Sequence, residues 1–213
     1  MIIAKFIAVV VIAYLLGSIP FGLIIGKLRG GVDVRKYGSG KTGATNVMRV
    51  VGTKLGILSM VLDVGKAAGA VMLAKMIIGN SVLVVGGFPL HWQVAQVMAG
   101  LAAVAGHNWP IFAKFKGGRG VTAYFGTLFA IFPPAGILGA EVLAISALRS
   151  RYMSLGSILG IIAPWCLLLP LTIAYNFPPI YLAYGLAGIA LLIYQHRDNV
   201  GRLQRGTERR LGG

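Results

Sequence analysis

The chain consists largely of long apolar runs, and this feature limits its possible folds more than any other. A helix needs about 20 consecutive apolar residues to cross the core of a bilayer. The sequence accordingly predicts seven spans, over residues 2–28, 55–78, 92–113, 120–132, 136–148, 155–174 and 179–195. The runs lack the alternation of apolar and polar residues that membrane β-strands show. We therefore expect an all-α integral membrane protein that forms one polytopic domain over residues 1–213.

Two of the predicted spans, 120–132 and 136–148, are short. Helices of that length reach only about 20 Å, at 1.5 Å per residue. We expect them to begin earlier in the chain, to thin the local bilayer, or to form a hairpin that does not fully cross it.

The basic residues favour one side of the predicted membrane. Of the 20 Lys and Arg residues, 17 lie in the first, third and fifth connections and in the C-terminal tail, counting Lys27 at the end of the first span. The connections around Gly86, Pro133 and Pro178 carry none. Because Lys and Arg collect on the cytoplasmic side, this pattern predicts seven transmembrane helices with the N-terminus outside and the C-terminus in the cytoplasm. The glycine-rich loops then share the cytoplasmic face.

The formal net charge of +15 indicates anionic partners, which are nucleic acid, anionic lipid or an anionic substrate. The one-sided distribution of basic residues explains much of this excess, so we expect contact with membrane lipids and none with nucleic acid. Only 12% of the residues are charged, which excludes an ordinary soluble domain. The single cysteine, Cys166, lies in an apolar run. We therefore expect no disulfide framework, no metal site and no cofactor.

The first connection contains the glycine-rich segment Gly38–Gly43, which includes the Gly-Lys-Thr that ends a nucleotide-binding P-loop motif. The first glycine of that motif is missing, because Arg35 stands at its position, and no strand precedes the loop. Closely spaced glycines still leave backbone N–H groups free to converge on an anion, and Lys41 and Arg49 add positive charge. The segment predicts a phosphate or carboxylate pocket, with a flexible surface loop as the alternative.

A second cluster spans residues 106–120, where Lys116 and Arg119 flank Gly117 and Gly118 just before an apolar run. This arrangement is typical of backbone N–H groups at a helix N-terminus that face an anion. The alternatives are a tight reversal for the glycines and an interfacial anchor for His107.

A third cluster lies where the last predicted span ends, at His196, Asn199 and Arg202. Their spacing places them on one side of a continuing helix. We favour a functional role for His196 and Asn199 over a solvated tail. Ser154, at the inner end of the sixth span, is expected to face the same pocket or to serve helix packing.

Asp63 and Lys66 stand three residues apart inside the second predicted span. Charges at that depth are costly, so we expect an internal ion pair, with direct contact to a substrate as the alternative. Elsewhere the sequence has no H-E-x-x-H zinc motif, no acid five positions after any histidine and no visible histidine–acid pair. A site with many anion binders and few bases is expected to act on anionic substrates that already carry a good leaving group.

Three stretches together resemble one family, the bacterial acyl-phosphate:glycerol-3-phosphate acyltransferases of the PlsY type. They are Gly17–Gly22 with Gly38–Asn46, Gly106–Pro110 with Phe115–Gly120, and His196–Glu208. The resemblance covers almost the whole chain in order. It departs from the usual family pattern at Lys41, where Asn is more common, and at Arg119, where Lys is more common.

The resemblance implies a site assembled from all three stretches. Ser39, His196 and Asn199 would take the catalytic roles, with His196 and Asn199 orienting the glycerol phosphate. The substrate- and phosphate-binding residues would be Lys41, Gly43, Thr45, Asn46, Arg49, His107, Lys116, Gly117, Gly118, Arg119 and Ser154.

The implied reaction transfers a fatty acyl group from acyl phosphate to the 1-hydroxyl of glycerol 3-phosphate, giving lysophosphatidic acid and phosphate in phospholipid biosynthesis. We expect direct attack by the hydroxyl, with a covalent acyl group on Ser39 as the rival mechanism. The expected location is the bacterial inner membrane with the site facing the cytoplasm. A soluble acyl-phosphate-producing enzyme is a further candidate partner on that face. The competing function is a membrane transporter for an organic phosphate.

Overall fold

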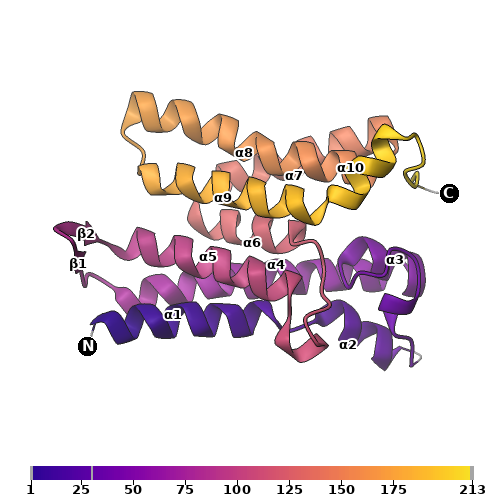
Figure 1. Ribbon diagram of the computed structural model, residues 1–213, viewed down its shortest axis with the longest axis horizontal. Helices are drawn as coiled ribbons and strands as arrows, with labels where there is room; N and C mark the ends of the chain where they lie inside the picture. The colour runs from indigo at the N-terminus through magenta and orange to yellow at the C-terminus, as the bar shows by residue number, and fades with distance from the viewer. Residues whose placement is uncertain (1, 30, 212–213) are drawn as a thin grey trace. The chain divides into compact units, whose positions relative to one another are not determined.

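The computed structural model describes residues 2–29 and 31–211 and is mostly helical there (Figure 1). The chain divides into two compact units, Met1–Ile131 and Phe132–Gly213. Three helical segments are long and apolar enough to cross a membrane, namely Ile2–Leu28, Thr53–Ile78 and Met153–Tyr175, and Val121–Ile131 and Pro179–Gln195 are shorter apolar helices. The predicted helical fold with apolar helices is thus confirmed, while the count of seven spans, the orientation and the single domain stay predictions.

The first unit is built on α1 (Ile2–Gly17), α4 (Thr53–Ile78), α5 (Trp92–Asn108) and α6 (Val121–Ile131). Figure 1 shows α1, α4 and α5 side by side. Glycines bring these helices close together: a Cβ on Gly17 would collide with the Ala103 carbonyl of α5, and one on Gly126 with the Val64 carbonyl of α4. Small residues at such crossings let helix backbones approach closely, as is common in membrane proteins.

The predicted span 2–28 is two helices rather than one. α1 ends at Gly17 and α2 (Phe21–Leu28) begins after Pro20. Proline has no N–H and its ring blocks the preceding turn, so a helix is interrupted there even where the sequence stays apolar. The break turns the chain toward the polar loops that follow.

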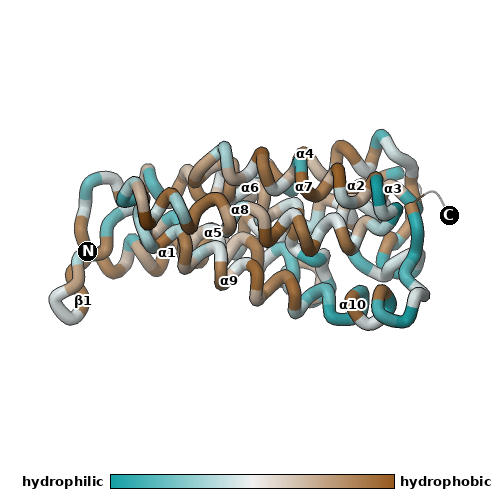
Figure 2. Tube along the Cα trace, turned by 90° about the horizontal axis from the view of Figure 1, so that it is seen from above, coloured by the Kyte–Doolittle hydropathy of each residue, from teal (hydrophilic) through white to brown (hydrophobic). Residues whose placement is uncertain are grey.

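Between α2 and α4 the predicted loop contains a 3₁₀ turn, η1 (Val34–Lys36), and a short helix, α3 (Ala44–Val51). Gly22 and Gly26 of α2 pack against this segment, because a Cβ on either would collide with Thr42 or Val34 respectively. This segment carries many polar residues, seen as teal around α3 in Figure 2.

Between α4 and α5 the chain forms an antiparallel hairpin, β1 (Leu83–Val85) and β2 (Phe88–Leu90), with Leu83 opposite Leu90. The turn residues Gly86 and Gly87 both have positive φ, at 56° and 83°. Such a turn matches the twist of a tight hairpin. The sequence predicted only a break at this point.

The second unit contains α7 (Pro133–Ser150), α8 (Met153–Tyr175), α9 (Pro179–Gln195) and α10 (Arg197–Gln204). The predicted span 136–148 starts too late, because prolines occupy the first turn of α7. Their missing N–H groups need no partner at a helix start. α7 is therefore 18 residues long, whereas α6, with 11, is as short as predicted.

Candidate active site

The first glycine-rich loop is held by the buried side chain of Asn46, in the first turn of α3. Its amide nitrogen donates to the carbonyls of Val34, Tyr37 and Lys41 at 2.8, 3.2 and 2.8 Å. Its carbonyl oxygen accepts the backbone N–H of Ser39 at 2.8 Å. Asn46 was predicted to bind substrate, but its polar atoms are engaged with the loop itself. It therefore fixes the backbone around Ser39.

Glycine is required in this loop by both conformation and space. Gly38 and Gly40 have φ of 57° and 70°, values that residues with a Cβ adopt at a cost. A Cβ on Gly38 would also collide with the amide oxygen of Asn46. The loop is thus a fixed turn, and the alternative of a flexible surface loop is disfavoured.

Asp33 and Arg35 connect the first glycine-rich loop to the second, which runs over residues 109–120 between α5 and α6. Asp33 pairs with Arg35 at 2.7 Å and also accepts the Arg35 backbone N–H at 3.0 Å. The hydrogen bond from Arg35 lowers the pKa of Asp33 to about 2, and the carboxylate in turn raises the pKa of Arg35. Arg35 Nη1 then donates to the Ala113 carbonyl at 2.9 Å. The ion pair therefore orients a guanidinium across the gap between the loops.

The second loop packs directly on His107. The backbone N–H of Gly118 donates to the His107 carbonyl at 3.1 Å. A Cβ on Gly117 would collide with that carbonyl, and one on Gly118 with the His107 ring. The two loops also meet each other, because the Thr42 N–H donates to the Gly117 carbonyl at 3.4 Å. The two predicted anion-binding loops are thus in contact and form one continuous surface.

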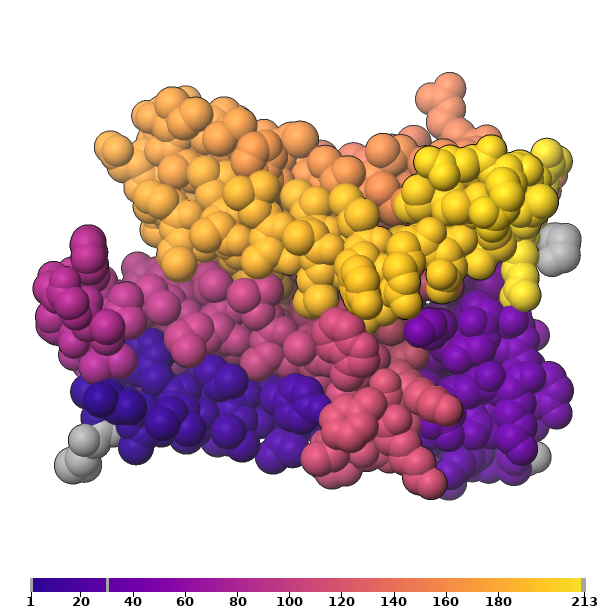
Figure 3. All heavy atoms as spheres, viewed as in Figure 1, coloured from indigo at the N-terminus to yellow at the C-terminus, as the bar shows by residue number. Residues whose placement is uncertain are grey.

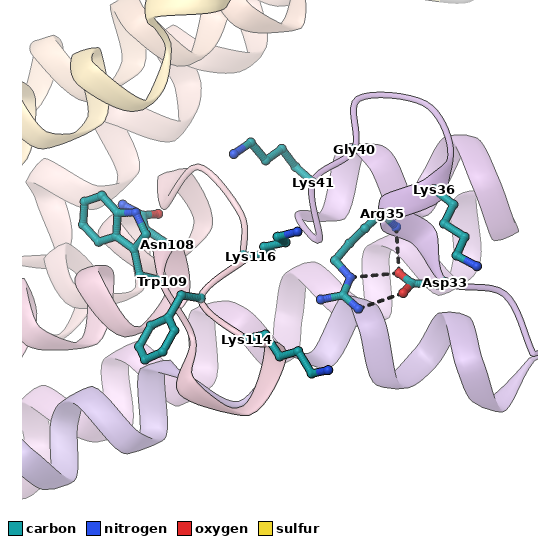
Figure 4. Close-up of a pocket in the computed structure, with 11 residues that line it drawn as sticks. Asp33, Arg35, Lys36, Gly40, Lys41, Asn108, Trp109, Lys114 and Lys116 are labelled. Carbon is teal, nitrogen blue, oxygen red and sulfur yellow. Dashed lines mark hydrogen bonds and ion pairs between the residues drawn. The ribbon is translucent and has the colours of Figure 1, made fainter.

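A cavity of about 480 Å³ opens where the loops meet. Figure 4 shows Lys41, Lys116 and Arg35 around it, with Asp33 bonded to Arg35. Figure 3 shows the second loop projecting beside the first on one face of the unit. The lining residues are Asp33, Arg35, Lys36, Gly40, Lys41, Asn108, Trp109, Lys114, Phe115, Lys116 and Gly117. Five cations and one carboxylate make this a cavity for an anion.

Sequence reasoning missed four charged lining residues, Asp33, Arg35, Lys36 and Lys114. Their signal was available, since all four flank the glycine-rich motifs, but the three basic residues were assigned to membrane orientation and Asp33 was not considered. Lys114 and Phe115 are consecutive residues with positive φ, at 55° and 59°. Non-glycine residues in this conformation are strained, and such strain collects at functional sites.

The predicted ion pair inside α4 is confirmed, with Lys66 Nζ 2.7 Å from Asp63 Oδ1. A third member was not predicted: His107 Nδ1 lies 3.5 Å from the same Asp63 oxygen. The prediction that no histidine–acid pair exists is therefore wrong. Because the His107 ring abuts Gly118 on its Nε2 side, this pair faces the backbone of the second loop.

The third cluster lies in the second unit and is centred on Glu208. Its carboxylate accepts from Ser154 Oγ at 2.9 Å, Asn199 Nδ2 at 2.8 Å and Arg202 Nε at 2.7 Å. Burial opposes ionisation of Glu208, but these three hydrogen bonds outweigh it and lower its pKa. Sequence reasoning named Glu208 only as part of the motif.

His196 separates α9 from α10, so the expected continuous helix is broken at that residue. Its Nδ1 lies 2.7 Å from the Leu192 carbonyl. Asn199 and Arg202 instead share the Glu208 carboxylate. Asn199 and Arg202 therefore share one partner, as their spacing predicted, while a role for His196 beside Asn199 stays a prediction.

The remaining predicted residues fall into two sets. Ser39, Lys41, Gly43, Thr45, Arg49, Lys116 and Arg119 lie with the two loops of the first unit, where Gly43 caps α3. Ser154, His196 and Asn199 lie in the second unit. Their roles toward a substrate stay predictions.

Comparison with known proteins agrees with this architecture. The family model described as glycerol-3-phosphate acyltransferase matches residues 7–206. Glycerol-3-phosphate acyltransferase 3 of Dehalococcoides mccartyi is 49% identical, over 99% of this chain and 98% of its own. The enzyme of Rubrobacter xylanophilus is 40% identical, over 96% and 94% respectively.

Solved structures agree as well. The chain is similar to the crystal structure of PlsY (YgiH), an integral membrane glycerol 3-phosphate acyltransferase, in its glycerol 3-phosphate form. The TM-score is 0.83 at 38% identity, covering 97% of this chain and 96% of that one. The lysophosphatidic acid form gives a TM-score of 0.82 at 37% identity, over 97% and 95%. This chain therefore belongs to the glycerol-3-phosphate acyltransferase family.

Proposed function

We propose that this glycerol-3-phosphate acyltransferase takes its acyl group from an acyl phosphate and transfers it to the 1-hydroxyl of glycerol 3-phosphate. The observation that carries the proposal is the cationic cavity where the two glycine-rich loops meet. Both substrates carry a phosphate, and convergent cations with backbone N–H groups suit that group. The apolar spans supply the surroundings that a fatty acyl chain requires.

The transfer is direct. The glycerol hydroxyl oxygen forms a bond to the acyl carbonyl carbon, and the bond from that carbon to the phosphate oxygen breaks. The leaving phosphate takes up the hydroxyl proton, so lysophosphatidic acid and inorganic phosphate are the products. Within the described residues His107 is paired with an acid, and its ring packs against Gly118. That packing supports a structural role for His107 and leaves proton transfer to the substrate.

Cations that converge on a phosphate stabilise the charge that develops on the leaving group. Ser39 lies next to Gly40 of the cavity wall, with its backbone held by Asn46. His196 and Asn199 orient glycerol 3-phosphate in this proposal, and the bond from Asn199 to Glu208 supports a fixed amide for that task.

The test is phosphate release from palmitoyl phosphate by protein in lipid nanodiscs, with and without glycerol 3-phosphate. Release that requires glycerol 3-phosphate and yields lysophosphatidic acid supports direct transfer from an acyl phosphate. We expect Ser39→Ala and His196→Ala to be impaired while remaining folded. A burst of phosphate without glycerol 3-phosphate, with acyl label retained on Ser39, would replace direct transfer with a covalent mechanism. Transfer from other acyl donors alone would overturn the proposed donor.

We also propose that the loops face the cytoplasm across a bacterial inner membrane. The concentration of basic residues in the loops that carry Lys41 and Lys116 supports this orientation. In a Cys166→Ser background, cysteine introduced at Ser81, near the hairpin, is expected to react with an impermeant maleimide in intact spheroplasts. Cysteine introduced at Lys114 is expected to react only after lysis. The reverse labelling pattern would contradict the orientation.

A further inference from the structure

Asp63 and Lys66 line the same small cavity as Thr42 of the first glycine-rich loop and Pro110 of the second. Only 4% of the Lys66 side chain and 2% of the Asp63 side chain are exposed. Two opposite charges at such depth are costly to desolvate, and a buried pair of this kind contributes little net stability on its own. The role of the ion pair therefore lies in its contacts with other elements.

Lys66 connects the pair to the first loop. Its Nζ donates to the Ile19 carbonyl at 2.6 Å, at the break between α1 and α2. Gly22, one turn further, packs against the Thr42 carbonyl so closely that a Cβ there would collide with it. Thr42 is buried at the end of the first glycine-rich segment. Lys66 therefore fixes the base from which the first loop extends.

Asp63 connects the pair to the second loop. His107 Nδ1 lies 3.5 Å from Asp63 Oδ1, and the His107 carbonyl accepts the Gly118 N–H at 3.1 Å. Gly117 and Gly118 rest on His107 with no room for a side chain. The position of the His107 ring and backbone thus determines where the second loop lies.

The two loops also contact each other, because the Thr42 N–H donates to the Gly117 carbonyl. The contacts therefore form a closed chain. Asp63 contacts His107, which carries the second loop; the second loop contacts the first; and the base of the first loop contacts Lys66 through Ile19. The cavity lined by Lys41 and Lys116 lies between the two loops that this chain of contacts joins.

We propose that Asp63 and Lys66 are positioning residues that set the spacing between the two glycine-rich loops, and so the geometry of the anion-binding cavity. The inference rests on the proposed function in that the cavity binds the phosphate of a substrate. Neither residue touches the substrate. Each acts through a backbone carbonyl or a histidine that carries a loop.

The main test is the double variant Asp63→Asn/Lys66→Met in nanodiscs. Removing both charges avoids leaving one unpaired in the interior, so folding is expected to be retained. The bond to Ile19 is lost, and we expect the KM for glycerol 3-phosphate to rise about tenfold or more, because small misplacements of binding groups are costly. Lys75→Met is the matched control, since Lys75 lies on the same helix over the Trp92 ring. It is expected to match the wild type.

A second comparison serves if the double variant does not fold. His107→Asn keeps an N–H near the place of Nδ1, whereas His107→Gln moves the amide toward the place of Nε2. We expect His107→Asn to keep a KM within about threefold of the wild type and His107→Gln to raise it about tenfold. If His107 only stabilised the fold, both variants would have a lower melting temperature and the same KM for glycerol 3-phosphate.

Trypsin cleavage after Lys41 and Lys116 gives a readout that does not depend on activity. The proposal expects faster cleavage at both loops in the double variant and wild-type rates in Lys75→Met. A folded double variant with wild-type KM, kcat and cleavage rates would overturn it. If the wild type transfers no acyl group, the proposed function fails, while the cleavage rates still decide whether the ion pair positions the loops.

Discussion

Replacing Asn46 by Asp exchanges the side-chain NH2 group for an oxygen and is expected to release the first glycine-rich loop. The wild-type amide nitrogen donates to three carbonyls, and the amide oxygen accepts the Ser39 N–H. Aspartate keeps only the last bond. Loss of two N–H donors costs about 1 kcal/mol each, and a buried carboxylate facing carbonyl oxygens adds about 1–3 kcal/mol more. Local opening of the loop thus becomes easier by at least about 3 kcal/mol.

Each 1.4 kcal/mol is a factor of ten, so the open population rises about 100-fold. Trypsin reads this population directly, by cleavage after Lys36 and Lys41. We expect cleavage to be fastest in Asn46→Asp, slower in Asn46→Ala and slowest in the wild type. Asn176→Asp, at an exposed helix end in the second unit, controls for the added charge and is expected to change nothing in the loop. Wild-type cleavage in Asn46→Asp would refute the reasoning.

Three further predictions follow from individual contacts. Because the pKa of Glu208 is lowered in the folded chain, its stabilising contribution is complete above its ordinary value of 4.5 and is lost as pH falls through the folded value; melting curves of Glu208→Gln should lack this acid dependence and show a lower midpoint at neutral pH. Gly118→Ala forces the His107 ring to move and should cost about 1–3 kcal/mol, whereas Gly65→Ala, which meets open space, should be neutral or stabilising by about 0.5–1 kcal/mol in the same melts. Lys114→Glu reverses a charge at the cavity wall, and its KM for glycerol 3-phosphate should rise at low salt and approach the wild-type value at about 1 M salt, where screening acts within about 3 Å.

The helices were largely predictable because membrane spans leave a direct mark on the sequence. α4 and α8 each begin within two residues of the predicted start and end within one of the predicted end. The break before α2 was missed because Ser18–Pro20 sits among apolar residues, so hydropathy continues through a turn that proline imposes. α3 was missed because it has only eight residues, too few for a helical repeat of apolar residues to be recognised in the sequence.

The sequence predicted which types of residue form the site but not which way their side chains point. The spacing of Asp63 and Lys66 predicted their pairing, since residues three apart share a helix face. His107 comes from another helix, and nothing in the local sequence shows that its ring meets Asp63. Asn46 was assigned to a substrate because a sequence does not show where an amide points.

The central claim is that the cationic loops serve transfer from acyl phosphate to glycerol 3-phosphate. The most direct measurement is phosphate release from palmitoyl phosphate by the purified chain in nanodiscs, with lysophosphatidic acid measured in the same samples. The account predicts that phosphate and lysophosphatidic acid appear in equal amounts and only when glycerol 3-phosphate is present. Folded protein that releases no phosphate from any acyl phosphate, yet carries organic phosphates into proteoliposomes, would contradict it.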